Sequence, residues 1–284
     1  MEIILASTYG LCQGVKYALN IVDYALKQYP RQKIYLLNHL VHNDYICQNL
    51  ERKGIIILDD SRSDEEKISS INDGIIIFSA HGHDSKLEDL AKSKNLTIID
   101  SACPKVKLNN NLIRNSIKNK RTIIYIGINN HPETIASLSI SKQIIFIDYK
   151  NPNYDVIQNV DNADVINQTT LAQEELKTIY EQLKKRISNL KIINGVCTST
   201  SKRQNALLEY NNQDFILIIG DKYSSNSTRL FEIGKKLNHN CYQISSLDEV
   251  KSLPLNKYKK GFITAGASTP DEVINPIIDY LKSI

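Results

Sequence analysis

Three cysteines occupy positions from which one metal centre could be assembled. Cys12, Cys103 and Cys197 each follow an apolar, strand-like run and a short turn, and each precedes a helical pattern. The two spacings are nearly equal, 103 − 12 = 91 and 197 − 103 = 94 residues. The carboxyl ends of strands in a βα fold point at a common crevice, so three thiolates delivered there would meet. Three ligands leave one coordination position open, as in a catalytic metal site.

These residues alone leave the identity of the metal open. Thiolate is the soft ligand that suits iron–sulfur clusters, zinc and cuprous copper, and the spacing does not choose among them. A lone cysteine is more often a small buried hydrophobic residue than a ligand. Cys47, within a helical pattern, and Cys241, in a strand-like segment, fit that description.

Three histidines stand just past strands, at comparable places. A single histidine there is usually an incidental hydrogen-bonded residue, but His42, His81 and His131 share the position. Imidazole N–H groups bind phosphate oxygens well, so the three predict an anion site. The other histidines lack this position and are interpreted as structural or surface residues: His39, His83 and His239.

Two serine-rich turns offer further donors for an anion. Ser224, Ser225 and Asn226 follow a strand and open a helix, whose positive end favours phosphate. Ser268 lies in a second turn of the same design. Ordinary N-capping explains either turn alone. Because both accompany the histidines, and no P-loop lysine is present, they predict a small diphosphate ligand and not a nucleotide.

One acidic residue is a candidate proton carrier. Glu133 follows His131 by two residues, and a carboxyl group facing a crevice donates or relays protons when its pKa is tuned. Taken alone, it is an acidic residue near a helix start. Thr169 has two possible roles, either to hydrogen-bond a substrate hydroxyl or to cap the helix that follows it.

Alternating apolar runs and amphipathic patterns predict the elements that position these residues. The helical patterns cover residues 15–27, 105–118, 171–187, 202–210, 227–237 and 270–282. The strand-like runs cover residues 3–6, 33–37, 54–58, 74–80, 96–100, 121–127, 143–148, 163–167, 191–195, 214–220 and 260–266. Continuous apolar strands between amphipathic helices predict mainly parallel sheets covered on both faces. The polar segment 149–161 shows no period and is predicted to be a loop.

The cysteine spacing predicts an α/β fold of three quasi-equivalent domains. Their expected bounds are 13–102, 103–194, and 1–12 plus 195–284. The first strand carries Cys12 before any unit is complete, so we expect it to join the last unit and close the chain into a ring.

Composition excludes several classes of protein. The 284 residues are 42% hydrophobic and 23% charged, and the net charge of +4 is too small to indicate a nucleic-acid partner. No apolar run approaches the roughly 18 residues of a membrane helix, and the start of the chain lacks the basic segment of a signal peptide. Five cysteines without local pairing do not predict a disulfide framework, so we expect a cytoplasmic protein.

Eight short motifs occur in order along nearly the whole chain: VHN (41–43), SAHG (79–82), ACP (102–104), HPE (131–133), QTT (168–170), RQ (203–204), SSNS (224–227) and TAGAS (264–268). Together with the three cysteines, this ordered set closely resembles the LytB/IspH family of hydroxymethylbutenyl diphosphate reductases. The resemblance implies three α/β domains around a central iron–sulfur cluster. It also implies the last step of the non-mevalonate isoprenoid pathway, in which an allylic hydroxyl is removed reductively to give isopentenyl and dimethylallyl diphosphates.

By this resemblance, Cys12, Cys103 and Cys197 would hold one [4Fe-4S] cluster with an open fourth iron. That iron would bind the substrate hydroxyl and pass on electrons supplied by ferredoxin or flavodoxin. Glu133 would be the proton source, and Thr169 would orient the hydroxyl. His131 would support proton delivery. The residues that would hold the diphosphate are His42, His81, His131, Ser224, Ser225, Asn226 and Ser268.

The chain departs from the family pattern at three places. Leu11 and Gln13 flank the first cysteine in place of the usual residues of GFCAGV. Asn129 and Asn130 replace a glycine-rich lead-in to HPE, and Thr198 stands where an aromatic residue often follows the third cysteine. Because surrounding residues tune a cluster, these departures bear on its potential more than on the type of reaction.

Two other functions compete with the reductase. A non-catalytic iron–sulfur sensor that binds a phosphorylated metabolite would keep the cysteines and phosphate donors, but it would need neither Glu133 nor Thr169. A structural zinc site would need a fourth ligand, and the sequence places none near the three cysteines.

Overall fold

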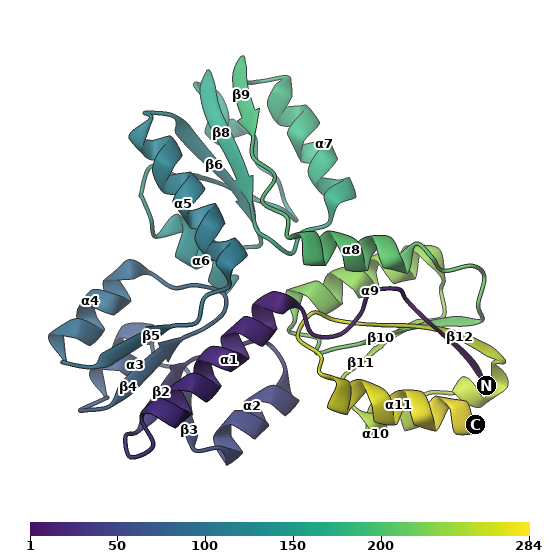
Figure 1. Ribbon diagram of the computed structural model, residues 1–284. Coiled ribbons are helices and arrows are strands. Elements are labelled where there is room, and N and C mark those ends of the chain that lie inside the picture. Colours follow the sequence, from purple (N-terminus) through teal and green to yellow (C-terminus); the bar gives the residue numbers. More distant parts are fainter. The chain divides into compact units, whose positions relative to one another are not determined.

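The computed structural model describes all 284 residues, which form two compact units (Figure 1). Unit 1 comprises Met1–Lys16, Val41–Leu50 and Thr198–Ile284. Unit 2 comprises Tyr17–Leu40 and Glu51–Cys197. Twelve strands make three four-stranded sheets, and every recorded strand pair is parallel.

Unit 1 holds one sheet, in the order β1-β12-β10-β11. Its strands are β1 (Glu2–Leu5), β10 (Phe215–Ile219), β11 (Cys241–Ile244) and β12 (Lys260–Ala265). β1 pairs with β12, with Ile3 opposite Gly261. The expectation that the first strand joins the last unit is therefore confirmed.

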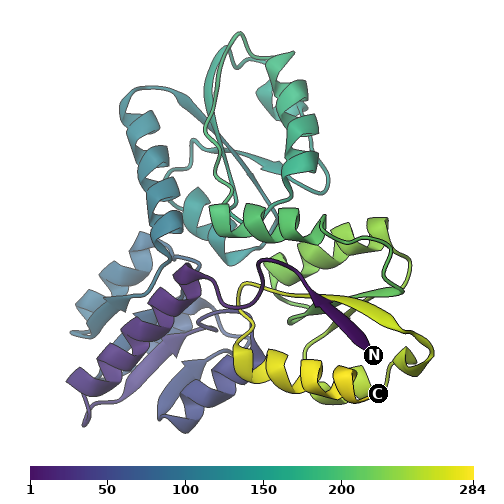
Figure 2. The same cartoon turned by 45° about the vertical axis from the view of Figure 1, so that its right-hand side comes forward.

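Helices cover both faces of the unit 1 sheet (Figures 1 and 2). On one face, α10 (Leu247–Lys251) and α11 (Asp271–Ser283) pack against alternate strand residues such as Leu217 and Ile263. On the other, α8 (Thr198–Leu207) and α9 (Ser225–Leu237) pack against the intervening residues. This alternation follows from the two-residue period of a strand.

Unit 2 holds the other two sheets, in the orders β3-β2-β4-β5 and β7-β6-β8-β9. The first contains β2 (Ile34–Leu37), β3 (Ile55–Leu58), β4 (Ile75–Phe78) and β5 (Thr97–Asp100). The second contains β6 (Thr122–Gly127), β7 (Ile145–Asp148), β8 (Asn162–Asn167) and β9 (Asn189–Ile192). Central strands such as β4 and β6 are almost wholly buried, whereas the edge strands are partly exposed. Such continuous burial is typical of parallel sheets, so the predicted fold class is confirmed.

The helices of unit 2 cover these sheets. α3 (Asp64–Ser69) and α4 (Ser85–Ser93) pack on β2 and β4. α5 (Pro104–Lys118) and α7 (Gln173–Lys184) lie on opposite faces of the β6–β8 pair, and α6 (Pro132–Leu138) follows β6 (Figure 2). The boundary between the two units falls within α1 (Gln13–Gln28) and α2 (Asp44–Arg52).

All eleven predicted strand runs overlap observed strands. The one observed strand outside these runs is β11, the strand-like segment around Cys241. All six predicted helices are observed, and five of them begin within two residues of the predicted start. The exception is α8, which begins four residues early, at Thr198. The segment predicted to be a loop contains a single 3-10 turn, η1 (Asp155–Ile157), and a second such turn, η2 (Leu255–Lys257), precedes β12. The strands of each sheet fall within one of the three predicted domain ranges, but the domain boundaries themselves stay a prediction. No helix is both long and apolar enough to cross a membrane.

Candidate functional site

Glu133 and Thr169 meet beyond the carboxyl ends of two neighbouring strands. β6 and β8 pair along their length; Glu133 lies in the first turn of α6 after β6, and Thr169 follows β8 by two residues. The Thr169 hydroxyl donates to Glu133 Oε2 at 2.7 Å, and the Thr169 backbone N–H donates to Oε1 at 2.8 Å. The two residues are 3% and 6% exposed. Because Ala172 is the N-cap of α7, Thr169 does not cap that helix.

Burial sets the protonation of this carboxyl group. Loss of solvation raises the pKa of Glu133 to about 7, and the two hydrogen bonds from Thr169 and the charge of Lys105 act in the opposite direction. A carboxylic acid with such a pKa is populated in both protonation states near neutral pH. Glu133 is therefore able to hold a proton and to release it.

Buried amide side chains fix the end of β8 beneath this pair. The Gln168 side-chain oxygen accepts from the Ile128 N–H at 2.9 Å, which ties the end of β8 to the turn after β6. Asn167 Oδ1 accepts from the Gly195 N–H at 2.9 Å and from the Tyr180 hydroxyl at 2.8 Å. Asn167 is a supporting residue that the sequence analysis missed. The signal was the polar NQTT run at the end of an otherwise mostly buried strand.

Two of the three predicted histidines come together in unit 2. His131 is the N-cap of α6, and its Nδ1 accepts the backbone N–H of Glu133 at 3.2 Å. A neutral His131 ring in this arrangement therefore carries its proton on Nε2. The rings of His81 and His131 lie 5.8 Å apart, centroid to centroid, in an edge-on arrangement. Asn130, just before His131, has a φ of 59°, a left-handed conformation that asparagine tolerates better than most residues.

Backbone hydrogen bonds attach two of the candidate cysteines to these groups. The Cys197 N–H donates to the Thr169 carbonyl at 3.0 Å. The Cys103 N–H donates at 3.0 Å to the carbonyl of Ala80, the residue before His81. Cys103 is also the N-cap of α5, and its side chain makes no capping hydrogen bond.

The remaining cysteine lies in unit 1, directly before α1. Its backbone N–H donates to the Ala267 carbonyl at 2.9 Å, which anchors it to the turn after β12. Its sulfur accepts the backbone N–H of Val15 at 3.4 Å. Cys12 therefore presents its sulfur at the N-terminus of a helix, where negative charge is favoured.

The candidate diphosphate donors of unit 1 also form one group. Ser268 donates its hydroxyl to the His42 carbonyl at 3.1 Å and lies 3.5 Å from the Ser224 hydroxyl. Asn226 Oδ1 accepts the Ala267 N–H at 3.0 Å, whereas its Nδ2 is buried without a hydrogen-bond partner. Ser225, next to Ser224 in the first turn of α9, is partly exposed. The orphaned amide donor of Asn226 fits a site that is completed by an anion.

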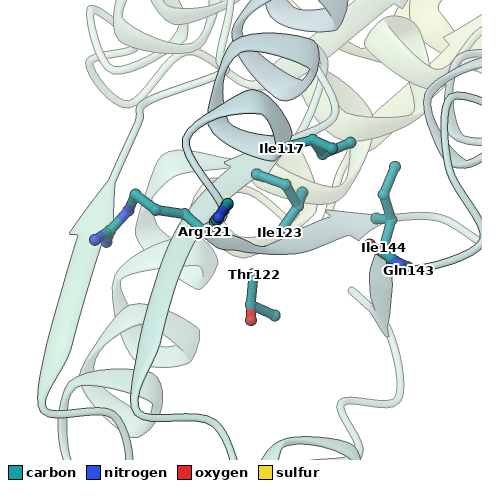
Figure 3. Close-up of a pocket in the computed structure, with 7 residues that line it drawn as sticks. Ile117, Arg121, Thr122, Ile123, Gln143 and Ile144 are labelled. Atoms are coloured by element: carbon teal, nitrogen blue, oxygen red, sulfur yellow. The ribbon is translucent and has the colours of Figure 1, made fainter.

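Two cavities lie apart from these groups. One of about 450 Å³ is in unit 1, lined by side chains that include Asn43, Asp221 and Glu272. The other, of about 300 Å³, is in unit 2 at the amino ends of β6 and β7, the edge opposite Glu133 (Figure 3). Arg121 borders that second cavity, but its guanidinium is bound to Asp164 and to backbone carbonyls. None of the predicted site residues lines either cavity.

The cysteines divide into two chemical kinds. Cys12, Cys103 and Cys197 form no disulfide and are partly exposed, and thiolates are the ligands that hold iron–sulfur clusters. Cys47 and Cys241 are buried, and burial raises the pKa of the Cys241 thiol to about 12. The donor set therefore fits the implied cluster. Cys12 belongs to unit 1 and the other two to unit 2, and within either unit no three His, Cys, Asp or Glu side chains converge to hold one metal ion.

Comparison with known proteins extends over the full chain. A protein in Malacoplasma penetrans named 4-hydroxy-3-methylbut-2-enyl diphosphate reductase is 37% identical, over 99% of this chain and 97% of its own length. One of the same name in Buchnera aphidicola is 38% identical, over 100% of this chain and 91% of its own. The solved E-1-hydroxy-2-methyl-but-2-enyl-4-diphosphate reductase from Plasmodium falciparum matches 98% of this chain and 87% of that one, with a TM-score of 0.87 and 27% identity.

The family model described as LytB protein matches residues 3–282. That match and the identities above agree with the ordered motifs and with the three parallel sheets. The chain belongs to the LytB protein family.

Proposed function

We propose that this protein is a 4-hydroxy-3-methylbut-2-enyl diphosphate reductase, an oxidoreductase of the non-mevalonate isoprenoid pathway. The substrate's allylic C–O bond breaks, two electrons and two protons enter, and water leaves, which gives isopentenyl and dimethylallyl diphosphates. The names of the full-length relatives support the reaction. The single structural observation that supports a proton step at particular atoms is the buried Glu133 carboxyl with its two hydrogen bonds from Thr169.

The cofactor in this proposal is one [4Fe-4S] cluster held by Cys12, Cys103 and Cys197. When bound, it supplies electrons and, at the iron without a cysteine ligand, a Lewis acid for the substrate hydroxyl. The partial exposure of these three thiols, in contrast to the buried Cys47 and Cys241, supports this assignment. We place the reaction in the cytoplasm, with ferredoxin or flavodoxin as the electron donor.

Glu133 has the properties that the proton step requires. An allylic hydroxyl leaves more readily as water than as hydroxide, so its departure needs a proton at the oxygen. With a pKa of about 7, Glu133 carries such a proton in a substantial fraction of molecules at neutral pH. The Thr169 hydroxyl donates its hydrogen to Glu133, which leaves its oxygen lone pairs to accept from the substrate hydroxyl. The pair thus orients the leaving oxygen beside its acid.

The diphosphate is assigned to two groups of donors. His81 and His131 lie together in unit 2, and a neutral His131 ring carries its N–H on Nε2, a donor type that suits phosphate oxygens. In unit 1 the N-terminus of α9 and the unpaired Asn226 amide suit phosphate oxygens. The assigned residues are His42, His81, His131, Ser224, Ser225, Asn226 and Ser268. Binding energy from this remote group positions the carbon skeleton for reaction.

The decisive test combines metal analysis with turnover. Protein purified anaerobically and reconstituted should contain about four irons and four sulfides per chain. With a low-potential reductant it should convert the allylic diphosphate to the two products. Glu133→Gln should lose turnover and keep its iron, whereas Glu174→Gln, at an exposed residue paired with Lys177, should keep both. Iron without turnover in the unchanged protein would instead indicate the sensor, and zinc without iron would indicate a structural metal site.

A further inference from the structure

Arg203 belongs to a motif of the family pattern whose role the proposed reaction does not explain. It lies in α8 and is only 3% exposed. One end of its guanidinium donates to the Gly10 carbonyl, 193 residues away in sequence. The other end donates to the carbonyl of Ser199, at 2.9 Å, and to the Ser199 hydroxyl. The guanidinium thus fastens the segment before Cys12 to α8.

The segment that Arg203 holds has other anchors as well. Near its start, the Ser7 N–H and hydroxyl donate to the carboxylate of Glu209, just after α8. The Gly10 N–H donates at 3.3 Å to the carbonyl of Ala265, the last residue of β12, and the Cys12 N–H donates at 2.9 Å to the carbonyl of Ala267 in the turn after it. Gly10 has a φ of +70°, and a Cβ there would come within 3.2 Å of Ile274 Cδ1. The backbone must therefore bend sharply two residues before Cys12. Arg203 supplies the contact from the α8 side of this bend.

We propose that Arg203 is a positioning residue that fixes the backbone of Cys12 before any metal binds. The inference rests on the proposed function, in which Cys12 is a cluster ligand. α8 begins at Thr198, directly after Cys197, so the helix that follows one ligand also holds the segment that precedes another. A ligand already in place loses less conformational entropy when the cluster binds.

The guanidinium is needed for its shape as well as its charge. Two different nitrogens of the planar guanidinium donate to Gly10 and to Ser199. A lysine ammonium is a point charge on a flexible stem and does not reproduce both contacts in fixed geometry. Arg203→Lys should therefore be intermediate between the unchanged protein and Arg203→Met, which removes every donor.

The first test is hydrogen–deuterium exchange on the full-length protein without its cluster. In Arg203→Met, the buried Gly10 carbonyl loses a charge-assisted partner, and the amides of Gly10 and Cys12 should exchange about tenfold faster or more. Exchange in the central strand β10 should stay within about twofold of the unchanged protein, because that strand is buried along its whole length. Arg203→Lys should show a smaller increase at the same two amides.

Arg229 supplies the matched control. It is 4% exposed, lies in α9 of the same unit, and pairs with Glu232. Arg229→Met removes an equally buried guanidinium from α9, where it pairs with Glu232, and we expect it to lower the melting temperature without faster exchange at Gly10 and Cys12. If Arg203→Met does not fold, Ser199→Ala replaces it in the exchange test. This variant removes one acceptor of the guanidinium and should accelerate exchange at the amides of Gly10 and Cys12.

The second test follows the metal. Reconstituted Arg203→Met should release iron to a chelator faster than the unchanged protein and faster than Arg229→Met. Unchanged exchange at Gly10 and Cys12, or equal acceleration over the whole unit, would overturn the proposal. Failure of the unchanged protein to take up iron would overturn the proposed function instead, and the exchange result would still decide whether Arg203 holds the Cys12 segment.

Discussion

Thr169 donates both its backbone N–H and its hydroxyl to the same carboxyl group, that of Glu133. The two bonds run to different oxygens, so they fix the plane of the carboxyl group as well as its position. The carboxyl group is therefore held in one orientation beside Thr169. In the proposed reaction, the Glu133 side chain then needs no change of rotamer before it transfers its proton.

Replacement of the acid by its amide isostere tests the proton step. Glu133→Gln keeps size and burial but cannot give up a proton at an oxygen. We expect turnover to fall by about 10²- to 10⁴-fold, with KM little changed. Single-turnover kinetics with a pre-reduced cluster separates this step from electron delivery. Full turnover in Glu133→Gln would remove Glu133 from the mechanism.

The raised pKa of Glu133 also predicts a pH dependence of stability. Because the carboxyl has a pKa of about 7 in the folded protein and an ordinary value of 4.5, the folded state binds the proton more tightly. Its contribution to the free energy of unfolding is fully present below about pH 4.5 and is lost as the pH rises through about 7. Melting temperatures of the cluster-free protein should show this decline. Glu133→Gln should lack it, and an identical pH profile in both proteins would contradict the prediction.

Thr169 separates the two hydrogen bonds experimentally. Thr169→Val removes the hydroxyl but leaves the backbone N–H. Since the hydroxyl bond lowers the pKa of Glu133, its loss should raise that pKa and move the acid-dependent limb of the rate profile upward by about one pH unit. Thr169→Ser should retain the original limb. A lower rate with an unmoved limb would mean that Thr169 acts only on the substrate.

In the serine-rich turns, residues proposed to bind the diphosphate should affect KM, whereas a buried packing residue should not. Asn226→Ala and Ser268→Ala each remove a proposed diphosphate donor and should raise KM by about tenfold, with a smaller effect on kcat. Ser227, on the same helix, is fully buried, and its hydroxyl has no partner and packs close to Gly220 and Gly266. Ser227→Ala should leave KM unchanged. A KM change as large in Ser227→Ala would attribute the effect to helix packing.

Gly195 tests the support beneath the acid. A Cβ at this position would lie 2.2 Å from the Asn167 carbonyl oxygen, so Gly195→Ala must displace the end of β8. We expect a loss of about 3 kcal/mol in the free energy of unfolding, together with reduced turnover. Gly54→Ala is the control, because its Cβ meets nothing within 4 Å and only its φ of +92° is unfavourable. Denaturant unfolding of both variants measures the difference.

The sequence predicted the strands well because nearly all of them are continuous apolar runs. β4 and β10 are buried along their whole length, so each appears in the sequence as an uninterrupted apolar run. β11 contains polar residues and was recognised only as strand-like around Cys241. Helix starts were less certain, because α8 opens with a polar Thr-Ser-Thr-Ser run that has no hydrophobic period.

The hydrogen bonds between Glu133 and Thr169 could not be predicted from the sequence. Both residues were candidates, but Thr169 was assigned to the substrate or to a helix cap. Their contact depends on β6 lying beside β8, which follows from the strand order of the sheet and not from any local pattern. The same holds for Arg203 and Gly10, whose separation of 193 residues hides their hydrogen bond.

The parallel pairing of β1 with β12 also has a consequence for synthesis on the ribosome. β1 leaves the exit tunnel before the other eleven strands, but its only partner strand, Lys260–Ala265, is the last of them to be made. The two sheets of unit 2 can form while translation continues, whereas the strand that leads to Cys12 must wait with an unpaired edge. Nascent chains released before residue 265 would therefore expose that edge, which makes them natural clients of chaperones.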